Sequence, residues 1–182
     1  MKKITYIITF FISIISFSQN EESKLSPNDI SQINELVKQF ENVLKKYYPS
    51  NSTEKSFELY LSDLELQKVN PAIIKEELCL KSFDEFKKTT TFNKIWIEQK
   101  TNTSKKSYRI NLNGDFYNYL IKNTTNLDVK KGYTEFRKIK DISPFLLVSA
   151  LKQYLKSSEY KSEINKISIT IMFYYDILLE YS

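Results

Sequence analysis

The sequence predicts an all-α protein, an irregular bundle of about six to seven helices around a buried C-terminal helix. Apolar residues recur at steps of three and four over several long stretches, which is the spacing of one face of an α-helix. Glycine occurs only twice in 182 residues, whereas sheet-based and nucleotide-binding folds use glycine in turns and phosphate loops. The length suits one domain that buries most of the surface its unfolded chain exposes.

Residues 1–18 have the three parts of a secretory signal peptide. Lys2 and Lys3 form the basic end, residues 4–17 are free of charge, and Ser16 and Ser18 place small residues before a cleavage point. A membrane-spanning helix needs about 18–20 apolar residues, and this run has 14, so cleavage is favoured over an uncleaved anchor or a core helix. We expect residues 19–25 to be a short flexible leader and residues 26–182 to form a single helical domain.

The most clearly marked helix is expected to begin after Ser26. Serine is a favoured N-cap, Pro27 suits the first helical position, and Pro49 would end the helix. A second helix is expected from about residue 53. The apolar stripe of the first helix comprises Ile30, Ile33, Val37, Phe40, Leu44 and Tyr47.

The middle of the chain gives shorter signals. The Asn70–Pro71 pair predicts a break followed by a short helix, and Ser82 and Glu85 have capping-box spacing, which predicts that a separate helix starts at Ser82. Residues 92–112 are consistent either with a small β-hairpin or with a helix end followed by a loop. Alternating apolar residues from position 108 favour a strand there.

The C-terminal segment, about residues 160–179, is expected to be the central helix. Its apolar residues cover almost the whole circumference, and a helix of that kind is buried. Alternate residues from Ile167 to Phe173 also fit a strand, but the pattern continues for about twenty residues and strands rarely exceed about ten. Two shorter helices are expected before it, one after Gly114 and one after Ser143.

The residues that are missing exclude several kinds of chemistry. The chain has no histidine and a single cysteine, Cys79, so serine or cysteine triads, histidine-based and thiolate zinc sites and iron–sulfur clusters are excluded. We expect Cys79 to be a buried apolar residue without a disulfide partner. We expect no cofactor and no metal, and carboxylate, lysine, tyrosine or serine chemistry is what remains for catalysis.

The charge is weakly basic and scattered. The net charge is +5, and it falls to +3 when residues 1–18 are removed. Nucleic-acid recognition needs clustered basic residues with arginine for bidentate contacts, and the chain has only Arg109 and Arg137. We therefore expect no nucleic-acid partner, and no stable membrane span after cleavage.

Two sets of residues are candidates for a functional site. Asp176 and Glu180 are four residues apart on the most apolar helix, so they share a face where burial beside a like charge would raise a carboxyl pKa for acid–base catalysis. No flanking motif supports catalysis by this pair. Aromatic side chains suit binding surfaces, and the candidates for such a surface are Trp96, Tyr117, Tyr119, Tyr174 and Tyr175.

The excess of lysine over arginine and the abundance of Asn, Ile, Tyr and Phe are typical of an AT-rich bacterial genome. The sequence thus favours an exported bacterial protein, periplasmic or extracellular, that acts as a non-enzymatic binding or interaction protein of the cell envelope. Its expected partner is another envelope or secreted protein. The alternatives are a carboxylate-dependent hydrolase of envelope glycans and a structural accessory subunit.

Overall fold

The structure, a computed structural model, describes residues 24–50, 52–99, 106–138 and 144–181, and it confirms the all-α prediction. The helices are α1 (Pro27–Tyr47), α2 (Thr53–Glu65), α3 (Glu77–Phe86), α4 (Thr90–Ile95), α5 (Asp115–Asn123), α6 (Leu127–Phe136), α7 (Pro144–Tyr154), α8 (Glu163–Thr170) and α9 (Asp176–Tyr181). The predicted signal peptide and most of the predicted leader lie outside the described residues.

Short elements connect the helices. Two 3₁₀-helices, η1 (Pro71–Lys75) and η2 (Ser157–Lys161), precede α3 and α8, and the strands β1 (Trp96–Gln99) and β2 (Ser107–Ile110) follow α4. A π-helical turn, η3 (Ile171–Tyr175), joins α8 to α9. Residues 163–181 therefore run as one helical segment, here called the C-terminal rod. With the rod counted once, the described residues form eight helices, against the six to seven expected.

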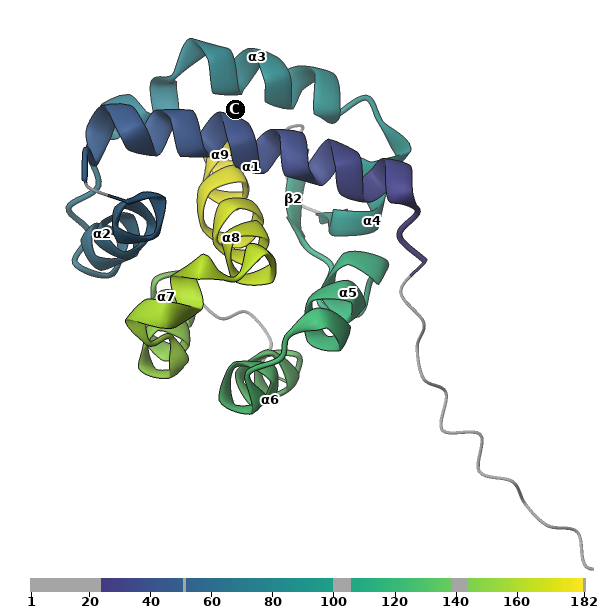
Figure 1. The fold of residues 1–182 in the computed structure, drawn as a ribbon. Helices are drawn as coiled ribbons and strands as arrows, with labels where there is room; N and C mark the ends of the chain where they lie inside the picture. The colour runs from purple at the N-terminus through teal and green to yellow at the C-terminus, as the bar shows by residue number, and fades with distance from the viewer. Residues whose placement is uncertain (1–23, 51, 100–105, 139–143, 182) are drawn as a thin grey trace, which may run out of the picture.

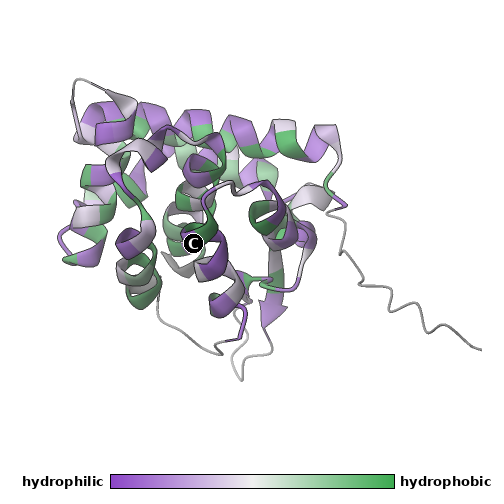
Figure 2. Ribbon diagram, turned by 60° about the horizontal axis from the view of Figure 1, so that its bottom comes forward, coloured by the Kyte–Doolittle hydropathy of each residue, from purple (hydrophilic) through white to green (hydrophobic). Residues whose placement is uncertain are grey.

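The C-terminal rod lies at the centre of the molecule (Figure 1). Helices α2, α5, α6 and α7 surround it, and α1 lies across it with α3 alongside. Apolar residues face inward on the surrounding helices, and polar residues face outward (Figure 2). This arrangement is what the apolar stripe of each outer helix and the nearly uniform apolar surface of the rod require, because each buries its apolar side against the other.

Helix α1 forms where its sequence signals place it. The Ser26 hydroxyl accepts a hydrogen bond from the Asp29 backbone N–H at 3.2 Å, and the Asp29 carboxylate accepts one from the Ser26 N–H at 2.7 Å. Together these bonds form a capping box. Lys45 and Lys46 lie in the last turn, where the helix dipole favours positive charge.

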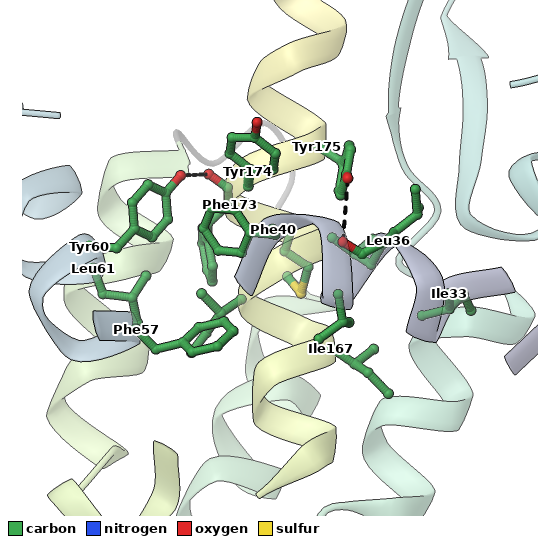
Figure 3. Close-up of a cluster of buried hydrophobic side chains, with 14 of the residues drawn as sticks. Ile33, Leu36, Phe40, Phe57, Tyr60, Leu61, Ile167, Phe173, Tyr174 and Tyr175 are labelled. Carbon is green, nitrogen blue, oxygen red and sulfur yellow. Dashed lines mark hydrogen bonds between the residues drawn. The ribbon is translucent and has the colours of Figure 1, made fainter. Parts of the chain in front are cut away.

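The rod supplies much of the core, as predicted. Its side chains from Ile167 to Tyr175 are buried, and the Tyr174 ring stacks on the Phe40 ring of α1 with 4.3 Å between the centroids (Figure 3). The alternative that this segment is a strand is wrong, because the backbone is helical throughout. Cys79 is fully buried and has no disulfide partner, which confirms its predicted role as a small apolar residue.

The hairpin expected near residues 92–112 is present. Strands β1 and β2 pair antiparallel, with Trp96 opposite Ile110 and Gln99 opposite Ser107. Helix α4 ends at Ile95, directly before β1 begins. The segment thus contains both features that the sequence left open, a helix end and a strand pair.

One helix start differs from the prediction, and one helix was not predicted. Ser82 lies in the middle of α3, which starts at Glu77, so the capping-box spacing from Ser82 to Glu85 did not mark a helix start. Helix α6 was not predicted at all. It contains Gly132, and a Cβ atom at that position would lie 3.3 Å from two ring carbons of Tyr154 in α7. Glycine weakens a helix, but here it allows α6 and α7 to pack closely.

Candidate functional site

The clearest concave site is an apolar groove, here called the α2–α3 groove. It has a volume of about 660 Å³, within the range of about 300–1,000 Å³ that is usual for small-molecule sites. It lies where the end of α2, η1, the start of α3 and the rod meet. Its lining residues are Tyr60, Leu64, Gln67, Val69, Pro71, Ile74, Lys75, Leu80, Tyr174, Ile177 and Leu178.

The floor of the groove includes the π turn of the rod. A π turn inserts one residue into a helix and is frequent at functional sites. Here the turn ends at Tyr175 and contains Tyr174, whose ring lines the groove, while Tyr175 turns to the other side and donates its hydroxyl hydrogen to the Leu36 carbonyl at 3.4 Å. The turn therefore directs two adjacent tyrosines to different surroundings (Figure 3).

The polar groups of the floor are occupied within the protein. The Tyr60 hydroxyl donates to the Phe173 carbonyl at 2.6 Å, and the Tyr174 hydroxyl donates to the Ile73 carbonyl at 3.1 Å. Burial raises the pKa of both phenols well above the usual range. Both tyrosines therefore stay neutral, and they present rings rather than available hydroxyls to the groove.

The rim carries one charge. Among the lining residues, Lys75 is the only one with an ionisable group that is charged at neutral pH, and it is exposed at the end of η1. The neighbouring Glu76 is already engaged, since its carboxylate accepts from the Lys46 ammonium at 2.6 Å and from the Tyr47 hydroxyl at 2.5 Å. These hydrogen bonds lower the pKa of Glu76. Among the described residues, no carboxylate lies within ion-pair distance of Lys75.

A strained residue lies at the edge of the groove. Gln67 has a φ of 56°, in the left-handed region. Helix α2 ends in a Schellman motif, with the Lys68 N–H bonded to the Asp63 carbonyl at 2.7 Å and the Gln67 N–H bonded to the Leu64 carbonyl at 3.1 Å. This motif usually has glycine at the position of Gln67. The chain instead keeps a side chain there, and that side chain lines the groove.

The aromatic candidates do not gather in one place. Tyr174 lines the groove, whereas Trp96, Tyr117 and Tyr175 are core residues and Tyr119 is half-buried. The Tyr117 hydroxyl donates to the Tyr133 carbonyl at 2.9 Å, and burial raises the pKa of Tyr117. The structure thus brings only one of the five to the concave site.

The structure joins two candidates from different sets. The indole N–H of Trp96 donates to the Asp176 carboxylate at 2.8 Å, which ties the hairpin to the start of α9. Asp176 is half-buried. Glu180 belongs to the same helix, and the position of its side chain lies outside what the structure describes.

Another hollow of the described surface runs along α3, and it is shallow and charged. Its lining includes two ion pairs at the C-terminal end of α3, Lys87 with Asp84 at 2.7 Å and Lys88 with Glu85 at 2.7 Å. Exposed pairs of this kind form a solvated helix face and contribute little to binding or stability. The α2–α3 groove is therefore the better candidate.

Most of the groove was not predicted from the sequence. The second helix and the break at Asn70–Pro71 were predicted, but the hollow between the end of α2 and the start of α3 was not. A short connection between two helices with apolar residues at both edges, such as Val69 and Ile74, was the available signal. The depth of the groove depends on where the rod passes, and local sequence patterns do not report that.

Comparison with known proteins identified no similar protein. No protein-family model matches the chain, and neither the curated proteins nor the solved structures give a significant match. Within the described part of the chain, no helix combines the length and the apolar character needed to cross a membrane. Nor do the described residues contain a group of three or more His, Cys, Asp or Glu side chains placed to hold a metal ion.

Proposed function

We propose that this chain is an exported bacterial binding protein of the cell envelope, without catalytic activity of its own, and that the α2–α3 groove is its binding site. The observation that carries the proposal is the groove itself. It is a mainly apolar hollow of ligand size, and the hydroxyls of Tyr60 and Tyr174 in its floor are both bonded within the protein. Export is supported by the signal-peptide pattern of residues 1–18.

The apolar area that the groove leaves open to solvent belongs mainly to Val69, Ile74, Leu80 and Ile177, which are half-buried. Leu64, Tyr174 and Leu178 are almost completely buried, yet each contributes to the wall or floor. A bound apolar group would remove the rest of this surface from water, and each Å² of apolar area removed contributes about 25 cal/mol. Binding rather than catalysis fits this lining, because its one ionisable group that is charged at neutral pH is a lysine at the rim.

A matched pair of substitutions tests this proposal. Leu80 lines the groove, whereas Leu78, two residues earlier on α3, is 56% exposed and does not line it. The purified protein is titrated with the neutral apolar dye N-phenyl-1-naphthylamine, whose fluorescence rises in apolar surroundings. Leu80→Trp should fill the groove and weaken dye binding about tenfold or more, a loss of about 1.4 kcal/mol.

Leu78→Trp is the control and should bind the dye like the unsubstituted protein. Circular dichroism and thermal unfolding of both variants check that each is folded. The proposal is overturned if the unsubstituted protein does not bind the dye, or if both variants bind it equally well.

A further inference from the structure

The groove also indicates the class of its ligand. We infer that it binds a linear, single-chain amphiphile with one carboxylate head group, the chemistry of a fatty acid. The tail would lie against the half-buried Ile74, Leu80 and Ile177, and the head would reach Lys75. This inference rests on the proposed function, since it names the ligand of the same site.

The floor and walls of the groove suit an apolar tail. Both floor hydroxyls are bonded to backbone carbonyls of the protein, so a polar ligand would lose its bonds to water on entering and gain none there. The walls come from Leu64, Ile74 and Leu178. A saturated chain is the ligand part that costs nothing in lost hydrogen bonds on such a surface.

The positive charge at the rim suits a carboxylate head group. The ammonium group of Lys75 has no ion-pair partner among the described residues, and Glu76 beside it is held by Lys46 and Tyr47. A ligand carboxylate at the mouth would therefore meet one positive charge that is not already neutralised. The amide of Gln67, across the same rim, supplies a neutral donor in addition.

The number of charges limits the head group. One exposed lysine complements one negative charge, and it would leave a second negative charge without a partner in the groove. Coulomb attraction at an exposed rim is weak, about fivefold in affinity. Lys75 would therefore select among amphiphiles of similar tail, while the apolar floor provides most of the affinity.

The test uses competition for the groove. Dodecanoate and 1-dodecanol have the same chain length and differ in the charge of the head, and each is used to displace N-phenyl-1-naphthylamine from the protein. Lys75→Gln should weaken displacement by dodecanoate about fivefold and leave displacement by dodecanol unchanged. Raising the ionic strength from about 0.05 to about 0.5 M should reduce the difference in affinity between dodecanoate and dodecanol, since salt screens an exposed ion pair.

Lys81→Gln is the matched control. Lys81 is exposed on α3 but does not line the groove, so this variant should behave like the unsubstituted protein toward both ligands. The inference is overturned if Lys75→Gln and Lys81→Gln have the same effect on dodecanoate, or if neither amphiphile displaces the dye.

The two proposals fail in different ways. If the dye binds in a manner that depends on Leu80 but neither amphiphile displaces it, the groove is a binding site and its ligand belongs to another class, such as an apolar segment of a protein partner. If the dye does not bind at all, the proposed function fails and the inference fails with it.

Discussion

The surroundings of the two ends of α1 differ, since α4 lies by its N-terminal end and α2 by its C-terminal end (Figure 1). At its N-terminal end, here called the closed end, Asp29 is 2% exposed and accepts hydrogen bonds from Ser26, Thr91 and Lys94. The Lys94 ammonium lies 2.6 Å from the carboxylate. These contacts join α4 to the first turn of α1.

The α2–α3 groove lies near the C-terminal half of α1, where Phe40 packs on Tyr60 and Tyr174, and part of its apolar lining stays uncovered. The hydrogen bonds there, such as those of Tyr60 and Tyr174, fix the floor but do not close the mouth. A fold that maximised stability would bury this area. Under the proposed function, the closed end contributes to stability, while the groove keeps apolar surface for a ligand to cover.

The largest expected effect comes from breaking the closed end. Asp29→Ala removes the acceptor of a buried network and leaves the Thr91 hydroxyl without its partner. It should lower the free energy of unfolding by about 3 kcal/mol, because removing one member of a buried pair leaves the others uncompensated. Chemical denaturation measures the change.

Dye binding supplies the control for this variant. At temperatures where Asp29→Ala is still folded, its affinity for N-phenyl-1-naphthylamine should equal that of the unsubstituted protein, since Asp29 does not line the groove. An equally large loss of dye affinity would show that the two ends are not independent.

The pH dependence of stability tests the role of Asp29 at the closed end. Burial alone would raise the pKa of Asp29, but hydrogen bonds from Lys94, Thr91 and Ser26 outweigh it and hold the pKa well below the usual range. As pH falls below about 4, the unfolded chain therefore takes up a proton at this carboxyl before the folded chain does. The contribution of Asp29 to stability is present above that pH and is lost as the pH falls further.

We expect the stability of the unsubstituted protein to fall more steeply between about pH 4 and pH 2 than that of Asp29→Asn. Urea denaturation at a series of pH values provides the comparison. Parallel curves for the two proteins would contradict the assignment of a depressed pKa to Asp29.

The smallest expected effect is at the groove. Gln67→Gly relieves the left-handed strain at the end of α2 but gives the unfolded chain more freedom, so the net gain in stability should be about 0.5 kcal/mol. It also removes a side chain from the rim, so dodecanoate should bind slightly more weakly. Thermal unfolding and dye displacement measure the two effects, and a clear loss of stability would show that Gln67 makes a contact that offsets its strain.

The sequence predicted the fold best where local signals and packing agree. Helix α1 has a serine cap, a proline at its first position and a continuous apolar stripe, and the structure has the helix there. Ser82 misled the prediction because capping-box spacing also occurs by chance inside a helix. Helix α6 was not predicted, because it contains Gly132 and glycine is unfavourable in a helix. The glycine is explained by the Tyr154 ring beside it, which belongs to another helix.

The site was harder to predict than the fold. Tyr174 was a candidate because tyrosine suits binding surfaces, and it does line the groove. Trp96 and Tyr117 were candidates for the same reason, as aromatic residues, but they lie in the core. Residue type alone does not separate these cases. The separation depends on which parts of the rod the outer helices cover, and that is a property of the assembled bundle.

The most direct test of the account is whether ligand contact is confined to the groove. In the protein with ¹³C-labelled isoleucine methyl groups, titration with N-phenyl-1-naphthylamine should shift the signals of Ile74 and Ile177, which line the groove. The signals of Ile33 and Ile95, both fully buried toward the closed end, should stay in place. Unchanged signals for Ile74 and Ile177, or equal shifts for all four, would contradict the claim that the α2–α3 groove is the binding site.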